Sequence, residues 1–234
     1  CKAGQAILAR HSPQVRKLVE EWLHWATLFH DVGKAIPEFQ RYISNPLAYQ
    51  VPRETSKAHA PASVFWWLAY SAKHDLPADL VTAVAAVVWR HHGSFPEFDG
   101  ATGLLYCLSS HEGILPGQLA GFPRDEIARE LGVDLPEEAA LDTTFEDEII
   151  GRYRPDELGL DEAILFRLRT QLLFSLLVES DRAYLALNGN ALTQYLKPAR
   201  EQLPPGSVVD EFLQAKPHTP VASLQTELRH EIMA

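Results

Sequence analysis

Apolar residues recur every three or four positions along most of this chain, and this helical spacing constrains the fold more than any other feature of the sequence. Four long segments carry the pattern: 15–29, 58–72, 77–92 and 161–187. No segment shows the alternation of apolar and polar residues, bounded by tight turns, that a half-buried strand requires. The sequence therefore predicts an all-α domain.

Polar and turn-forming residues indicate where these helices begin and end. Ser56 is a candidate N-cap for the segment 58–72, because a serine hydroxyl can accept a hydrogen bond from the first helical turn. Asn188 and Gly189 are expected to end the longest helix. A shorter helix is predicted over 124–131.

At 234 residues, the chain has a length that suits one domain, and we predict a single domain over residues 1–234. Residues 93–160 contain clustered Pro, Gly, Asp and Glu, which indicates an irregular insertion in the helical fold. A proline-rich surface connection is expected over 196–220. It leads to an amphipathic last helix over 221–232.

The sequence predicts a cytoplasmic protein with no membrane partner. Its two cysteines, Cys1 and Cys107, are too few for a disulfide framework and suit a reducing compartment. The longest apolar runs, such as 83–89, are far shorter than the roughly 18 residues of a membrane-spanning helix. No charged and then apolar leader opens the chain, so we expect no secretion.

The charge balance limits how the chain can bind nucleic acid. Lys and Arg number 21 against 31 Asp and Glu, which gives a formal net charge of −10. This excess argues against a broad nucleic-acid-binding surface, although it is compatible with a local basic groove. The basic residues near the motifs described below would form only a narrow track; they are Arg41, Lys57, Lys73 and Arg90. We therefore expect weak, salt-sensitive binding of DNA by this chain alone.

Histidine and aspartate residues with the chemistry of metal ligands recur in four separated segments. They are His30 and Asp31, then His59, then His91 and His92, and finally Asp181. Taken singly, each has an ordinary structural explanation, such as a surface turn for a His-Asp pair or a helix end for His-His-Gly. Folded helices would nevertheless bring the four segments together.

The surroundings of these residues favour a shared site. Asp181 follows Leu177 by four residues and Val178 by three, which places it on their apolar helix face. A buried carboxylate is costly unless it is paired or bound to a metal. His59 and His91 also lie on apolar stripes. One centre with one or two divalent ions would satisfy all of these groups. Imidazole with carboxylate suits Mn, Fe, Co, Ni or Zn better than Ca or Mg alone, and Mg is kept as an alternative.

Three strings carry a resemblance to a known family: HDVGKAIPEFQRYI at 30–43, KAHAPAS at 57–63 and RHHG at 90–93. They resemble the HD-domain metal-dependent phosphohydrolases, which are helical bundles. The resemblance is greatest to the HD nuclease of type I CRISPR systems, the Cas-three HD domain. It covers about residues 11–93 and 161–190, and it includes neither the insertion nor the tail.

The resemblance implies a role for each clustered residue. One metal ion would be held by His30, Asp31 and Asp181, and a second by Asp31, His59, His91 and His92. Lys34 would face the scissile phosphate and steady its developing charge. Two ions roughly 3.5–4 Å apart would clamp the attacking and leaving oxygens and lower the pKa of a bound water.

The resemblance also implies an early histidine ligand from the first helix, for which His11 is the candidate. His11 lies 19 residues before His30, a span of about 28 Å on one straight helix. The two could share an ion only if the chain turns between them; otherwise His11 is not a ligand. Both interpretations stay open on the sequence.

The function implied by the resemblance is a metal-dependent nuclease that cleaves single-stranded DNA in CRISPR interference. Its partners would be a helicase domain or subunit and a Cascade-type effector complex. Two alternatives stay open. One is a small-molecule phosphohydrolase, such as a nucleotidase or a cyclic-nucleotide phosphodiesterase, with the same metal centre. The other is a non-catalytic HD module for assembly, although every expected ligand after His11 is present.

Overall fold

The computed structural model describes residues 8–9, 13–50, 56–93, 95, 113–137, 157–187 and 189–191. All regular elements in these ranges are helical, which confirms the all-α fold class. No helix among them is long and apolar enough to cross a membrane. The candidate ligand His11 lies outside the described residues.

The helices in the described ranges agree with the apolar spacing of the sequence. They are α2 (Pro13–Phe29), the 3-10 helix η1 (Val32–Ala35), α3 (Pro37–Ser44), α4 (Ala60–Lys73), α5 (Ala78–Arg90), α7 (Leu115–Leu119), α8 (Arg124–Leu131) and α10 (Leu160–Ala186). The five predicted helices that fall in these ranges each correspond to one of them, with ends that agree within two residues.

Ser56 is not the N-cap of α4, and this prediction was wrong. The helix begins at Ala60, with His59 at the N-cap position and no side-chain capping hydrogen bond. The Ser56 hydroxyl instead accepts a hydrogen bond from the Ala58 amide at 3.1 Å. A separate turn therefore precedes α4, and the His59 imidazole is left for other contacts.

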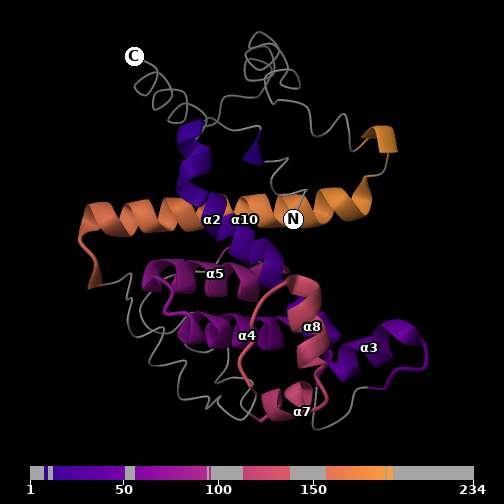
Figure 1. Cartoon of the computed structure of the whole chain (residues 1–234). Coiled ribbons are helices and arrows are strands. Elements are labelled where there is room, and N and C mark those ends of the chain that lie inside the picture. Colours follow the sequence, from indigo (N-terminus) through magenta and orange to yellow (C-terminus); the bar gives the residue numbers. More distant parts are fainter. Residues whose placement is uncertain are drawn as a thin grey trace, which may run out of the picture. The chain divides into compact units, whose positions relative to one another are not determined.

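The core lies where α4 and α5 pack against each other. α5 lies between α4 and α10, and α2 packs against both α5 and α10 (Figure 1). Trp66, Trp67 and Phe29 are among the fully buried side chains of this core. The Trp67 indole donates a hydrogen bond to the Val81 carbonyl at 3.0 Å, which ties α4 to α5.

The connections between these helices bring distant segments to one place. A short turn, residues 74–77, joins α4 to α5, so the two helices run antiparallel. The first residue of α4 therefore lies beside the last residues of α5. Because η1 also packs against α4, three chain segments meet at this end of the helix pair.

The longest helix, α10, contributes a buried stripe to the core. Phe166, Thr170, Leu173 and Leu177 are buried at three- and four-residue spacing. Asp181 continues this stripe by one turn, as predicted, but it is half-buried rather than buried. The expected full burial was wrong: at this turn the carboxylate lies with His30 and Asp31, which are themselves half-buried.

Residues 113–137, which fall in the range 93–160 predicted as an irregular insertion, pack against the core, and the insertion as a whole stays a prediction. Leu115 and Phe122 are buried, and the Phe122 ring stacks on Trp66 with centroids 4.8 Å apart. Within 113–137, Pro116 lies in the first turn of α7, and Pro123 and Gly132 cap α8. The short helix α7 buries Leu115 and Leu119.

The predicted organisation of the C-terminal part stays a prediction. The connection over 196–220 and the helix over 221–232 fall in the part of the chain that the structure does not describe. All described residues belong to one compact unit, Cys1–Leu196.

Candidate metal centre

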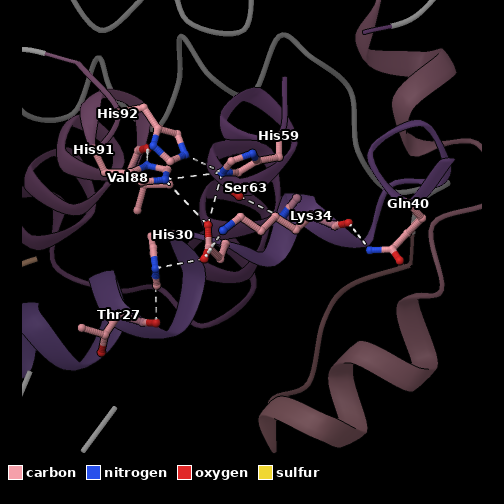
Figure 2. Close-up of polar contacts among 11 residues, drawn as sticks. Thr27, His30, Lys34, Gln40, His59, Ser63, Val88, His91 and His92 are labelled. Atoms are coloured by element: carbon pink, nitrogen blue, oxygen red, sulfur yellow. Dashed lines mark hydrogen bonds and ion pairs between the residues drawn. The ribbon is translucent and has the colours of Figure 1, made fainter. Parts of the chain in front are cut away.

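His30 and Asp31 follow directly after α2, where the chain turns into η1. The His30 amide donates to the Ala26 carbonyl at 3.0 Å, which extends the helical pattern by one residue. The His30 imidazole Nδ1 lies 3.0 Å from the Thr27 carbonyl oxygen (Figure 2). A carbonyl only accepts, so Nδ1 carries a proton and Nε2 is the ring nitrogen that faces the cluster. Nε2 faces Asp31 Oδ2 at 3.3 Å.

His91 is held in the same manner at the end of α5. Its Nδ1 lies 2.6 Å from the Val88 carbonyl oxygen, so Nδ1 again carries a proton and Nε2 faces the cluster. The residue is buried, and its Nε2 lies 3.7 Å from Asp31 Oδ1. Histidine ligands of metal ions are commonly oriented in this way, by a carbonyl that accepts from the outer ring nitrogen.

His59 faces this pair of segments from the N-terminus of α4, and its ring converges with those of His91 and His92 (Figure 2). Its Nε2 lies 3.1 Å from Nε2 of His92 and 3.4 Å from Nε2 of His91. It also lies 3.2 Å from Asp31 Oδ1. His59 is buried whereas His92 is exposed, so the group opens to solvent on the His92 side.

Asp31 belongs to two sets of side chains, and within each set the ligand atoms lie within 4.8 Å of one another. One set contains His30, Asp31 and Asp181; the other contains Asp31, His59, His91 and His92. The structure thus brings together the six predicted ligands that it describes. It also divides them as the resemblance implies. Their role as ligands is part of the proposal below.

The donor atoms of both sets fit divalent cations. Asp31 Oδ1 is buried and has no hydrogen-bond partner among the described residues. The Nε2 atoms of His91 and His59 lie 3.7 and 3.2 Å from this oxygen and 3.4 Å from each other. A divalent cation bound between these atoms would give each of them a partner. Imidazole nitrogen with carboxylate oxygen is a donor set that suits first-row transition metals and zinc.

The electrostatics of the cluster keep its groups in the forms that bind metal ions. Burial alone would raise the pKa of the Asp31 carboxyl, but attraction to the imidazoles of His30, His59 and His91 holds that pKa well below its usual range. Burial lowers the pKa of His92 to about 4, and the nearby imidazoles of His91 and His59 act in the same direction. At neutral pH, Asp31 is therefore a carboxylate and His92 is neutral.

A close approach of two backbone segments requires glycine at position 33. A Cβ atom at Gly33 would lie 2.0 Å from the His59 carbonyl oxygen. The Gly33 amide donates to the buried Ser63 hydroxyl at 2.8 Å, which ties η1 to the first turn of α4. The glycine of the HDVGK string therefore lets Asp31 approach His59.

Lys34 lies beside the two donor sets. Its Nζ donates to Asp31 Oδ2 at 2.7 Å, and its side chain is half-exposed. The Gln40 side-chain amide donates to the Lys34 carbonyl at 2.7 Å, which joins α3 to η1 (Figure 2). The ammonium group is thus both next to Asp31 and accessible from solvent.

Gln118 positions the segment before His59, a role that no sequence pattern predicted. This residue of α7 is buried, and its Nε2 donates to the carbonyl oxygens of Ser56 and Ala58 at 2.8 and 2.7 Å. These contacts hold the turn that leads into His59. No local signal marks Gln118, because its partners are backbone atoms 62 and 60 residues earlier in the chain.

The expected track of basic residues is only partly formed. Lys73 is at the opposite end of α4 from His59, about 20 Å along the helix axis, and it pairs with Asp134 at 2.5 Å. Arg41 pairs with the Glu38 carboxylate at 2.8 Å. Lys73 therefore does not belong to the track, because the length of α4 separates it from His59.

A protein family described as Cas3, HD domain matches residues 2–132 of this chain. The match extends beyond residue 93 into the range predicted as an insertion, in agreement with the packing of 113–137. No curated protein and no solved structure matches the chain.

The matched residues make up more than half of the 234, and they contain five of the six clustered side chains. Asp181 lies beyond the match, and its place in the cluster rests on the geometry alone. The chain belongs to the Cas3 HD domain family.

Proposed function

We propose that this protein is a metal-dependent nuclease that cleaves single-stranded DNA in the cytoplasm during CRISPR interference. Its family implies a metal-dependent hydrolase that is associated with CRISPR systems and nucleic-acid substrates. The observation that carries the proposal is the pair of donor sets that share Asp31. A carboxylate shared by the two sets would hold two ions close together, as two-metal hydrolysis of a phosphodiester requires.

Six side chains would hold the two ions. His30, Asp31 and Asp181 would hold one ion, and Asp31, His59, His91 and His92 would hold the other. When bound, the ions supply Lewis acidity and lower the pKa of a coordinated water. Asp31 keeps the two sets together, because its Oδ2 faces His30 and its Oδ1 faces His59.

Lys34 and the exposed side of the cluster would receive the substrate. The Lys34 ammonium would exchange its contact with Asp31 Oδ2 for a non-bridging oxygen of the scissile phosphate, where it balances developing charge. His92 is the exposed member of the histidine group, so the phosphodiester would approach from its side.

We also propose that a helicase domain or subunit and a Cascade-type effector complex deliver the strand. The net charge of −10 supports this proposal, because a nuclease with few unpaired basic groups near its site holds DNA weakly. Delivery by these partners would raise the local concentration of the DNA strand at the site and so compensate for the weak affinity of the chain.

A nuclease assay tests the proposed function directly. Purified protein loaded with Mn, Co or Ni should degrade a labelled single-stranded oligonucleotide, and EDTA should stop the reaction. Release of inorganic phosphate from mononucleotides, with the oligonucleotide left intact, would favour a small-molecule phosphohydrolase instead. If metal-loaded protein cleaves neither substrate, the assembly role gains support and the nuclease proposal fails.

Replacing the shared carboxylate tests the site. Asp31→Ala should reduce both cleavage and bound metal to background, because both donor sets lose a ligand. Asp125→Ala, at an exposed position on α8, is the matched control and should change neither. Metal content by mass spectrometry and oligonucleotide cleavage should be measured on the same samples. Retained cleavage in Asp31→Ala would contradict the assignment.

A further inference from the structure

A row of three aromatic side chains leads away from the candidate metal centre along α3. The Phe39 ring packs edge-on against the His59 ring, with centroids 5.2 Å apart. The Tyr42 ring follows at 6.1 Å from Phe39, and the Tyr49 ring at 5.5 Å from Tyr42. Phe39, Tyr42 and Tyr49 form this aromatic row, and all three are half-buried. Each therefore keeps part of its surface accessible beside the site.

Lys57 lies over the aromatic row. Its Nζ is 3.7 Å from the centroid of the Tyr42 ring and 5.9 Å from that of Tyr49. None of the ion pairs among the described residues includes Lys57. A ring face holds an ammonium group less firmly than a buried ionic partner does, so Lys57 can exchange this contact for a phosphate.

The placement of these groups matches how proteins hold single strands. Proteins that bind unpaired DNA without sequence preference stack its bases on aromatic rings and neutralise its backbone with nearby cations. Here the rings begin in contact with the candidate ligand His59, Lys57 lies over the row, and Lys34 lies at Asp31 in the donor sets. A strand laid along the row would therefore place a phosphodiester at the donor sets.

We infer that the aromatic row and Lys57 bind the nucleotides next to the scissile bond of single-stranded DNA. This inference rests on the proposed nuclease function and names the residues that hold its substrate. On binding, the Lys57 ammonium leaves the face of Tyr42 for a backbone phosphate. A base then stacks on the vacated ring.

Two variants of Tyr42 test the stacking contact. Tyr42→Leu keeps an apolar side chain but removes the ring, so KM for a single-stranded oligonucleotide should rise about tenfold with little change in kcat. Tyr42→Phe keeps the ring and should behave as the wild type. Hydrolysis of bis-p-nitrophenyl phosphate, which is too small to reach the row, should be the same in all three proteins. If Tyr42→Leu lost activity equally on the oligonucleotide and on bis-p-nitrophenyl phosphate, Tyr42 would have a structural role and the inference would be overturned.

An oligonucleotide that lacks its bases separates stacking from other effects. The wild type should bind an abasic strand about tenfold more weakly than a normal strand, as measured by fluorescence anisotropy in EDTA at low salt. In Tyr42→Leu this difference should shrink. A difference of the same size in both proteins would mean that the bases do not stack on Tyr42.

A matched pair of lysine variants tests the phosphate contact and remains informative if Tyr42→Leu does not fold. Lys57→Gln and Lys73→Gln each remove one positive charge from a segment next to or within α4, but only Lys57 lies at the row. Lys57→Gln should weaken oligonucleotide binding several-fold, and Lys73→Gln should leave it near the wild-type value. If Lys57→Gln and Lys73→Gln changed oligonucleotide affinity equally, the inference would be overturned.

The nuclease proposal and this inference can fail separately. If the wild type cleaves no oligonucleotide with any metal, the proposed function fails, and the anisotropy measurements still decide whether the row binds DNA. If the wild type cleaves the oligonucleotide but Tyr42→Leu and Lys57→Gln match it in KM and affinity, the function stands and the row is only structural.

Discussion

Asp31 is the residue on which the candidate metal centre depends most. Its two carboxylate oxygens face different groups, with Oδ2 toward His30 and Lys34 and Oδ1 toward His59 and His91. No other described side chain belongs to both donor sets. This explains why a single aspartate, placed at the turn after α2, can link segments from four parts of the chain.

Lys34→Ala should separate catalysis from metal binding. The ion pair of Lys34 with Asp31 is half-exposed, and such pairs contribute only about 0–1 kcal/mol to stability. Folding and metal content should therefore change little. Turnover should fall by a factor on the order of 100, because a positive group near the developing charge is lost. Lys73→Ala, which also removes a lysine from an ion pair, should keep full turnover. Loss of metal in Lys34→Ala would reassign the residue to a structural role.

The stability of the metal-free protein should fall as the pH is lowered from about 6.5 toward 4. Burial lowers the pKa of His92 from 6.5 to about 4. Between these values the unfolded chain binds more protons than the folded protein, so protonation favours unfolding. The Asp31 carboxyl has a lowered pKa as well, and its contribution is lost only as the pH falls below its ordinary value of 3.8.

Urea unfolding in EDTA at several pH values checks this expectation. The free energy of unfolding should decrease across the window from 6.5 to about 4 in the wild type. His92→Gln removes the titrating imidazole and should give a flatter dependence. An unchanged slope in that variant would show that other groups account for the loss.

At the scale of elements, the contact between η1 and α4 is what assembles the site. Gly33 donates a buried hydrogen bond to Ser63 and lies close to the His59 carbonyl. These two contacts hold the turn that contains Asp31 against the start of α4. The two partners of that hydrogen bond are 30 residues apart in the chain.

Gly33→Ala should damage stability and metal binding together. The added Cβ would lie 2.0 Å from a backbone oxygen that cannot move without displacing His59. Overpacking of this kind typically costs about 1–3 kcal/mol in the free energy of unfolding. Gly113→Ala is the matched control, because an added Cβ there meets nothing within 4 Å. Urea unfolding and calorimetric metal titration of both variants test the expectation. Equal stability and equal metal affinity of Gly33→Ala and Gly113→Ala would contradict it.

The sequence predicted where helices begin and end better than it predicted how they pack. The helices α2, α5 and α10 follow from apolar residues that repeat at three and four positions, a local signal that needs no tertiary information. The core position of 113–137 was missed because its apolar residues lie between prolines and glycines, which interrupt the helical spacing. Their burial depends on contacts such as that of Phe122 with Trp66.

At the scale of the whole molecule, the negative net charge should make DNA binding weak. In the part of the chain that the structure describes, Arg41 and Lys73 are paired with carboxylates, which leaves few cations for phosphates. With two or three phosphate contacts, the slope of log affinity against log salt for a single strand should lie at about −1.4 to −2.1. Anisotropy in EDTA between 50 and 200 mM salt measures it. Tight binding to duplex DNA without metal would contradict the expectation.

The helical class, the identities of the clustered histidines and aspartates, and the link to HD phosphohydrolases could all be obtained from the amino-acid order. Side-chain chemistry and helical periodicity are local properties, so they can be read without coordinates. The half-burial of Asp181, the close approach at Gly33 and the support from Gln118 could not be obtained in this way. Each depends on which surfaces of distant helices meet, and that outcome is set by packing across tens of residues rather than by any neighbouring sequence.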